Sequence, residues 1–247
     1  MNFRSIDLET TGLPEQDGLP TGIMQIGWCD GNMDDPIPPP KSAFVNCGIG
    51  VSIEARAVHH ISDDMVADGI GPTEACGILA DGDFEYQTAH NIDHEKHYVG
   101  AGFKPGTDEP REWICSYKTA FRLWPDAPGH KLHELRYFLD LDAESDFDPQ
   151  YCQQPHRAPD DAYVGAHLLR RILVEAEQKD IPVSKLVHWS SGPALLVICF
   201  MKKHKGKPWS QVAREDRPYL EWIYEKSDVK DRDIIATVKY WLKQTAN

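Results

Sequence analysis

Two acidic residues near the start of the chain, Asp7 and Glu9, have a spacing that suits metal-dependent chemistry. They belong to a segment that begins near Phe3, carries the apolar Ile6 and ends before Gly12, as expected for a β-strand. Residues i and i+2 of a strand point to the same face, so the two carboxylates should lie side by side. Such like charges repel, and a hard divalent cation with oxygen ligands relieves the repulsion. A solvated strand end is the alternative, so a metal site requires further carboxylates.

Two later segments place acids and histidines beside helix starts. The first reads Ala-His-Asn-Ile-Asp-His-Glu-Lys-His over residues 89–97, where we expect a strand to lead into a helix. The second, His-Arg-Ala-Pro-Asp-Asp-Ala over residues 156–162, puts Asp160 and Asp161 in the first turn of a helix. Acids there also complement the helix dipole, which is a purely structural alternative. The histidines at 90, 94 and 97 do not form the His-Glu-x-x-His zinc motif, and we interpret them as surface histidines.

In this order, the three segments resemble the motifs of the DEDDh exonuclease superfamily, the proofreading-exonuclease group with an RNase H-like fold. The motifs are Asp-x-Glu-Thr-Thr-Gly-Leu from residue 7, Ala-His-Asn from residue 89 and His-x-Ala-x-x-Asp-Ala from residue 156. Ala-Val-His-His-Ile at residues 57–61 is similar to the nucleotide-pocket segment of that group. Residues 112–118, 122–125 and the sequence beyond residue 190 resemble the bacterial exodeoxyribonuclease X family, so the resemblance covers nearly the whole chain.

The resemblance implies that the acids hold two Mg²⁺ or Mn²⁺ ions and that an imidazole is the general base. The first and third motifs contribute the acids Asp7, Glu9 and Asp161 and the base His156. In the family pattern, the remaining acid is an Asp four residues after the Asn of the second motif, and this chain departs from the pattern with Glu95 at that position. Asp93 lies two residues earlier and remains the alternative ligand.

The resemblance also implies a substrate, DNA, which would be cut at single-stranded or duplex 3′ ends to release 5′-mononucleotides. The residues expected beside the terminal nucleotide are Thr10, Thr11, Gly12, Leu13, His59 and Asn91. An exoribonuclease of the same superfamily is one alternative, because the sequence does not reveal discrimination against the 2′-hydroxyl. A nucleic-acid-binding protein whose nuclease site has decayed is another, and the acid at residue 95 is its only support.

Charge is distributed unevenly along the 247 residues. Residues 1–194 carry 15 basic and 32 acidic side chains, whereas residues 195–247 carry 11 and 7, within a net charge of −13. The asymmetry predicts two modules, the second of them suited to an anionic partner. With the resemblance, we expect an exonuclease domain at residues 1–185 and a small basic module at residues 195–247. The basic turn at residues 202–207 gives this module a potential grip on DNA phosphates, although a solvated turn would look the same.

The elements that must position these residues follow from periodicity and turn signals. Strands are expected at residues 3–8, 23–29, 42–47, 84–89, 113–115 and 195–200. Helices are expected at residues 72–79, 117–123, 131–139 and 158–178, in part of 53–67, and in two stretches beyond 217. This order predicts an α/β or α+β fold with a mixed sheet. The resemblance favours α/β and implies an RNase H-like sheet flanked by helices, with a small C-terminal α+β appendage. We interpret the acidic residues 140–148 as a solvated loop.

Composition places the chain among soluble globular proteins. It is 41% hydrophobic and 26% charged, and its longest apolar run is too short to span a bilayer. Its six cysteines are scattered without a Cys-x-x-Cys motif, as in proteins of a reducing compartment. We therefore expect a cytoplasmic protein with no membrane contact, and the sequence leaves a homodimer open.

Overall fold

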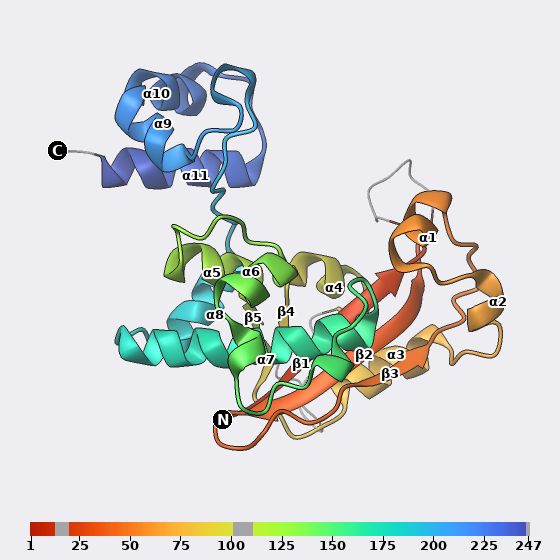
Figure 1. Ribbon diagram of the computed structural model, residues 1–247. Coiled ribbons are helices and arrows are strands. Elements are labelled where there is room, and N and C mark those ends of the chain that lie inside the picture. Colours follow the sequence, from red (N-terminus) through yellow and green to blue (C-terminus); the bar gives the residue numbers. More distant parts are fainter. Residues whose placement is uncertain (13–19, 101–110, 246–247) are drawn as a thin grey trace.

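A computed structural model describes residues 1–12, 20–100 and 111–245 of the chain. Within them, five strands form one mixed sheet in the order β3-β2-β1-β4-β5, with β1 at its centre (Figure 1). The strands are β1 (Asn2–Thr10), β2 (Ile23–Asn32), β3 (Lys41–Phe44), β4 (Tyr86–Ala89) and β5 (Glu112–Cys115). β2 is antiparallel to both β1 and β3, whereas β4 runs parallel to β1 and β5. The predicted α/β fold with a mixed sheet is confirmed.

Helices cover both faces of this sheet. They are α1 (Ile53–His59), α2 (Asp63–Val66), α3 (Pro72–Ala80), α4 (Ile92–Val99), α5 (Ser116–Leu123), α6 (Leu132–Phe138), α7 (Ala158–Gln178) and α8 (Val183–Ser191). Phe3 of β1 packs into the same core cluster as Val164 and Leu168 of α7. Its neighbours Ile6 and Leu8 pack into a second cluster with α3 and α4. The odd-numbered residues of β1, Asp7 and Glu9 included, therefore face the α7 side of the sheet.

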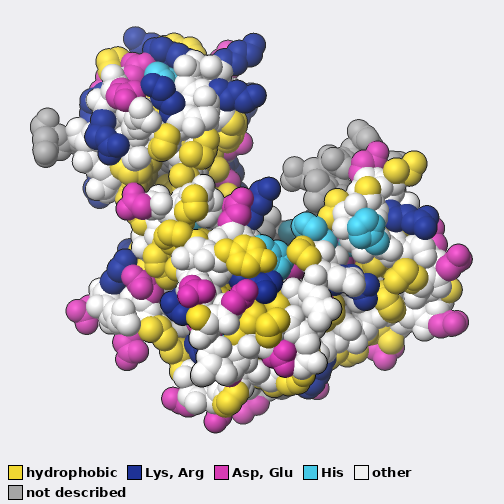
Figure 2. All heavy atoms as spheres, in the orientation of Figure 1, with side chains coloured by type: hydrophobic (Ala, Val, Ile, Leu, Met, Phe, Trp, Pro, Cys, Tyr) yellow, Lys and Arg dark blue, Asp and Glu magenta, His cyan; other side chains and the backbone are white. Residues whose placement is uncertain are grey.

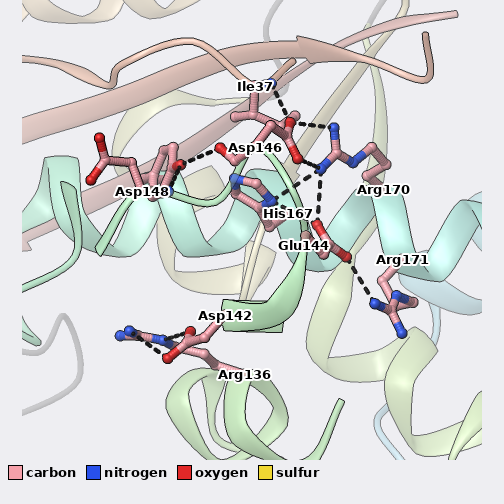
Figure 3. Close-up of polar contacts among 10 residues, drawn as sticks. Ile37, Arg136, Asp142, Glu144, Asp146, Asp148, His167, Arg170 and Arg171 are labelled. Atoms are coloured by element: carbon pink, nitrogen blue, oxygen red, sulfur yellow. Dashed lines mark hydrogen bonds and ion pairs between the residues drawn. The ribbon is translucent and has the colours of Figure 1, made fainter. Parts of the chain in front are cut away.

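The acidic stretch before α7 is not the solvated loop that we predicted. Glu144 and Asp146 form an ion-pair network with α7, and their side chains are only 14% and 16% exposed (Figure 3). Arg170 lies 2.6 Å from Asp146 and 2.9 Å from Glu144, and the backbone N–H of Ile37 donates to Asp146 at 2.8 Å. The prediction was wrong because the cations that neutralise these acids lie more than twenty residues later. The network ties the connection between β2 and β3 to α7.

The C-terminal residues form a separate module above the sheet (Figure 1). Its helices are α9 (Trp209–Glu215), α10 (Arg217–Lys226) and α11 (Arg232–Gln244), which bury their own apolar cluster around the fully buried Trp209. The predicted strand at residues 195–200 is wrong, since this stretch has only an isolated bridge between Ile198 and Pro208. The appendage is therefore helical rather than α+β.

The backbone of that stretch explains the difference. The N–H of Ala194 donates to the Asp233 carboxylate at 3.0 Å, and the N–H of Leu196 donates to the Thr237 hydroxyl at 2.8 Å. Side chains of α11 thus accept the backbone hydrogen bonds that carbonyls of a neighbouring strand would otherwise have accepted. In the described part of the chain, no helix is long and apolar enough to cross a membrane.

The Arg170 network predicts a pH-dependent contribution to stability. Burial would raise the pKa of Glu144, but hydrogen bonds from His167, Arg170 and Arg171 outweigh it and lower the pKa to about 2. The hydrogen bond from Arg170 is the main cause that lowers the pKa of Asp146 to about 2. The folded-state pKa values lie below the unfolded values of about 4, so the stabilisation is complete above that pH and is lost as the pH falls towards 2.

Arg170→Leu should therefore lower the free energy of unfolding at neutral pH by about 3 kcal/mol, as when one partner of a buried ion pair is removed. The deficit should shrink when urea unfolding is repeated near pH 2.5. Arg171→Leu is the matched control, because that side chain is 34% exposed and its pair should contribute less than about 1 kcal/mol. Equal losses in both variants, or a deficit independent of pH, would contradict this account.

Candidate active site

Three carboxylates meet where β1 ends and α7 begins. Asp7, Glu9 and Asp161 each offer an oxygen within 4.8 Å of the others. Asp7 and Glu9 face the α7 side of the sheet, and Asp161 lies in the first turn of α7. Glu9 and Asp161 are 7% and 8% exposed, so most of this charge is withdrawn from water. The structure thus brings together three of the acids that the sequence singled out.

A glycine lets α7 approach the sheet this closely. Gly27 of β2 pairs with Asp7 across the strands, and a Cβ on Gly27 would lie 2.1 Å from the backbone carbonyl of Ala158. Any side chain there would push the start of α7 away from β1. The side chain of Gln25 also reaches the helix start, where it accepts the Ala158 N–H at 3.3 Å. The position of Asp161 therefore depends on the close contact at Gly27.

Asp161 is also held from outside its helix. The backbone N–H of His156 donates to Oδ2 of Asp161 at 3.1 Å, and Nε2 of His133 lies 2.8 Å from Oδ1. His156 has a φ of 63°, a left-handed conformation that is uncommon for a side chain other than Gly, Asn or Asp. Its exposed imidazole lines a cleft of about 730 Å³ that Asp7, Asn91 and Asp161 also line. Figure 2 shows histidine side chains gathered at a hollow on this face of the molecule.

The two candidates for the fourth acid have opposite environments. Glu95 is 4% exposed, and its Oε2 is buried with no hydrogen-bond partner in the described part of the chain. Asp93 has a side chain that is 69% exposed and forms an ion pair with Lys118 at 2.7 Å. A buried oxygen without a partner is costly, whereas the charge of Asp93 already has a counter-ion. Glu95 lies outside the group of three oxygens at 4.8 Å, yet it is close enough to repel both Asp7 and Glu9.

Crowding of buried like charges raises the pKa values of these acids. Burial, followed by repulsion from Asp161, Glu9 and Glu95, raises the pKa of Asp7 well above its usual value. Burial is also the main cause that raises the pKa of Glu9 and of Glu95 to about 8 in each case. Arg157 opposes this effect at Glu9. The protein alone therefore supplies too little positive charge to keep all of these groups ionised.

This donor set fits a hard divalent cation. Carboxylate oxygens are the ligands that Mg²⁺ and Mn²⁺ prefer, and a cation would relieve both the mutual repulsion and the orphaned Oε2 of Glu95. The other cluster with such spacing among the described residues contains Glu144, Asp146 and His167. There, Arg170 and Arg171 already neutralise the acids. A divalent cation therefore fits the cluster at the end of β1 better than the cluster around Glu144.

The residues expected to border a terminal nucleotide are divided between two hollows, one lined by Glu9 and one lined by Asp7. A hollow of about 290 Å³ is lined by Glu9, Thr10, Gly12, Val58 and His59 together with five neighbours. Asn91 lies in the larger cleft with Asp7 and His156 instead. Thr11 is buried, and its hydroxyl accepts the N–H of Gly22 at 3.0 Å. Leu13 lies outside the described residues.

His59 and His90 have both ring nitrogens engaged within the protein. Nδ1 of His59 accepts the N–H of Ile61 at 3.0 Å, so its Nε2 donates to the carbonyl of Thr10 at 3.1 Å. Nε2 of His90 lies 2.8 Å from the carbonyl of His130, and burial lowers the pKa of His90 to about 4. Both rings thus anchor the backbone around the site. The prediction of a surface histidine is wrong for His90, whose side chain joins β4 to the segment before α6.

Sequence reasoning missed two residues that the structure places at the site. His133 contacts Asp161, and Lys118 neutralises Asp93 and donates to the carbonyl of Ser190 at 3.3 Å. Neither residue lies in one of the three motifs. A hint existed for Lys118, because it ends the segment at residues 112–118 that resembles the exodeoxyribonuclease X family. Nothing local in the sequence marks His133, which comes from α6 and meets an acid 28 residues later.

Comparisons with known proteins agree with the motifs. No family model matches the chain. Exodeoxyribonuclease 10 of Escherichia coli (strain K12) is 29% identical over 243 residues, which are 98% of this chain and 100% of that protein. A solved structure, Exonuclease X in complex with 5′ overhanging duplex DNA, has a TM-score of 0.58 at 27% identity over 76% of this chain and 99% of that chain.

A more distant structure extends the likeness in fold. E. coli Exonuclease I in complex with a dA16 oligonucleotide has a TM-score of 0.51 at 12% identity over 76% of this chain and 42% of that chain. At this identity, the likeness concerns the RNase H-like fold alone. This chain is thus similar over nearly its whole length to exodeoxyribonuclease 10, and its fold is similar to that of Exonuclease X.

Proposed function

We propose that this protein is a metal-dependent 3′–5′ exodeoxyribonuclease that releases 5′-mononucleotides from DNA 3′ ends. The observation that carries the proposal is the carboxylate cluster: Asp7, Glu9 and Asp161 within 4.8 Å, with the unpartnered oxygen of Glu95 buried nearby. A protein has little reason to bury this much like charge unless a cation binds there. The similarity to a protein named exodeoxyribonuclease 10 and to an exonuclease solved with DNA supports DNA as the substrate.

In this proposal, Asp7, Glu9, Glu95 and Asp161 hold two Mg²⁺ or Mn²⁺ ions. The ions would supply Lewis acidity at the scissile phosphate and offset the charge that develops on the leaving 3′ oxygen. The four side chains contribute oxygens from three separate elements, β1, α4 and α7. Because the ions would neutralise these acids, a domain with excess negative charge could still bind the DNA strand, which is a polyanion.

His156 is the proposed general base. Its exposed imidazole lines the cleft beside Asp161, and its backbone is fixed by the hydrogen bond to that carboxylate. A neutral imidazole can accept a proton from an attacking water. The water oxygen bonds to phosphorus, and the bond from phosphorus to the 3′ oxygen breaks. The products are a 5′-mononucleotide and a strand shortened by one residue with a new 3′-hydroxyl.

The substrate would occupy both hollows, the one lined by Glu9 and the one lined by Asp7. We propose that the terminal nucleotide lies against Thr10, Gly12 and the half-exposed Val58, and that the strand continues past Asn91. An exoribonuclease of the same superfamily is the closest alternative, and matched DNA and RNA oligonucleotides would separate the two. A decayed site is less consistent with the geometry, because the substituted acid, Glu95, is buried and close enough to repel Asp7 and Glu9 rather than exposed to solvent.

The central test is release of mononucleotides from a 3′-labelled DNA strand with and without Mg²⁺. Wild-type protein should release them only with the cation. Asp7→Ala and Asp161→Ala should each reduce the rate by at least about 100-fold, since each removes charge stabilisation at the phosphate. Thermal unfolding of each variant checks that the fold is retained. Persistent cleavage in either variant would refute the assignment of the site.

A second test separates the two candidates for the fourth acid. Glu95→Gln should abolish most of the Mg²⁺-dependent cleavage, because it removes a buried charge among the cation ligands. Asp93→Asn removes a charge that is 69% exposed and is already paired with Lys118, and the Asn oxygen can still accept a hydrogen bond from that lysine, so its activity should stay near wild type. A larger loss in Asp93→Asn than in Glu95→Gln would reverse the assignment.

We further propose that residues 1–185 are the exonuclease domain and that the module at residues 195–247 binds the strand away from the cut. Of the basic turn, Lys203 and Lys207 form ion pairs with Asp216 and Glu215 at 2.6 and 2.8 Å, which leaves Lys202 and Lys205 exposed. Trp222 of α10 is 48% exposed and stacks on Tyr219 with ring centroids 5.9 Å apart. This pair offers a surface on which a base could stack.

Trp222→Ala should therefore weaken binding of a long single-stranded oligonucleotide by about 10-fold, since one stacked base contributes roughly 1–3 kcal/mol. Cleavage of a dinucleotide, which is too short to reach the module, should be unchanged. Tyr224→Ala is the matched control, because Tyr224 is 49% exposed on the other side of the same helix. Fluorescence anisotropy measures the binding. Equal losses in the two variants would argue against this surface.

A further inference from the structure

Both oxygens of the Asp161 carboxylate contact groups outside α7. The backbone N–H of His156 donates to Oδ2 at 3.1 Å, and the His133 imidazole meets Oδ1 through Nε2 at 2.8 Å. One contact on each oxygen fixes the plane of the carboxylate as well as its position. The His156 contact comes from the adjacent loop and uses the backbone alone. The His133 contact is made by a side chain, so a substitution at that residue can remove it.

The segment before α6 aims His133 at this oxygen. The carbonyl of His130 accepts a hydrogen bond from the buried ring of His90 at 2.8 Å, and the His130 ring stacks on Phe121 with centroids 4.0 Å apart. The backbone N–H of Lys131 then donates to the Glu134 carboxylate at 3.0 Å, which closes the first turn of α6. Residues of β4, α5 and α6 thus fix the point from which the imidazole extends.

The contact with Asp161 is the main polar interaction of the His133 ring. Its side chain is 21% exposed and lines the cleft beside Asp161. Its Nδ1 is buried without a hydrogen-bond partner in the described part of the chain, so the contact with Asp161 is its one polar contact there. An imidazole placed for packing alone would not need to direct its other nitrogen at a carboxylate of the cluster.

A carboxylate can accept about four hydrogen bonds or ligands, so the two contacts leave capacity on the side of Asp7 and Glu9. In metal sites, partners outside the ligand shell orient the ligands, and their loss typically weakens cation binding by about 10- to 100-fold. We infer that His133 is a positioning residue that orients Asp161 towards Asp7 and Glu9 and thereby sets the affinity of the site for divalent ions. The inference rests on the proposed role of Asp161 as a cation ligand.

The test compares two amides of different reach at this position. The Gln amide of His133→Gln can still donate to Oδ1, whereas that of His133→Asn is one methylene too short. Isothermal titration of the full chain with Mn²⁺ should show about 10-fold weaker binding for His133→Asn and for His133→Ala. His133→Gln should recover most of the affinity. His188→Ala, an exposed position on α8 outside the cleft, should bind as tightly as wild type.

Equal Mn²⁺ affinity of the Asn and Gln variants would overturn the inference, as would a wild-type protein that binds no Mn²⁺. Melting temperatures without the ion show whether a variant is folded, and the Asn–Gln pair keeps the comparison valid if the Ala variant unfolds. Mononucleotide release is recorded separately. Wild-type protein that binds Mn²⁺ but releases no nucleotide would refute the proposed nuclease and leave the role of His133 standing.

Discussion

The close approach of α7 to the central strand is the constraint on which the site depends. Gly27 has no side chain to hold the helix away, so the first turn of α7 reaches Asp7 and Glu9 and adds Asp161 to them. The same contact buries the acids and raises their pKa values. Burial of like charges costs free energy in the protein alone, and a divalent cation offsets that cost when it binds. The fold and the affinity for cations are therefore linked.

The two groups of buried acids respond to pH in opposite directions. Glu144 and Asp146 have lowered pKa values because arginines pair with them, so they stabilise the fold above their unfolded pKa values. Glu9 and Glu95 have pKa values raised to about 8, so the protein without a cation loses stability as the pH rises from about 4.5 towards 8. The arginine network ties α7 to the connection between β2 and β3. It thereby helps to hold the helix whose start carries Asp161.

Local patterns in the sequence were enough to predict β1, α7 and the acids that they carry. Alternating polarity placed Asp7 and Glu9 on one face, and the helix over residues 158–178 has the bounds that its apolar stripe predicted. Spacing within the motifs also favoured Glu95 over Asp93, and the burial of Glu95 is consistent with that preference. These features depend on neighbours within a few positions along the chain.

The features that the sequence did not predict depend on partners far away. The acids at 144 and 146 were predicted to be solvated, but they pair with arginines of α7. The apolar stretch at residues 195–200 was predicted to be a strand, but backbone N–H groups at its start donate to side chains of α11. His133 belongs to the same class, because its contact with Asp161 exists only once α6 packs beside α7. Periodicity describes the faces of an element and does not specify which distant side chain lies opposite.

The central claim is that Asp7, Glu9, Glu95 and Asp161 form one cation site. The most direct measurement is anomalous diffraction from a crystal soaked in Mn²⁺. Two anomalous peaks about 4 Å apart, with oxygens of Asp7, Glu9, Asp161 and Glu95 among their ligands, are the predicted result. Peaks bound by Asp93, or peaks found only beside Glu144 and Asp146, would contradict the account.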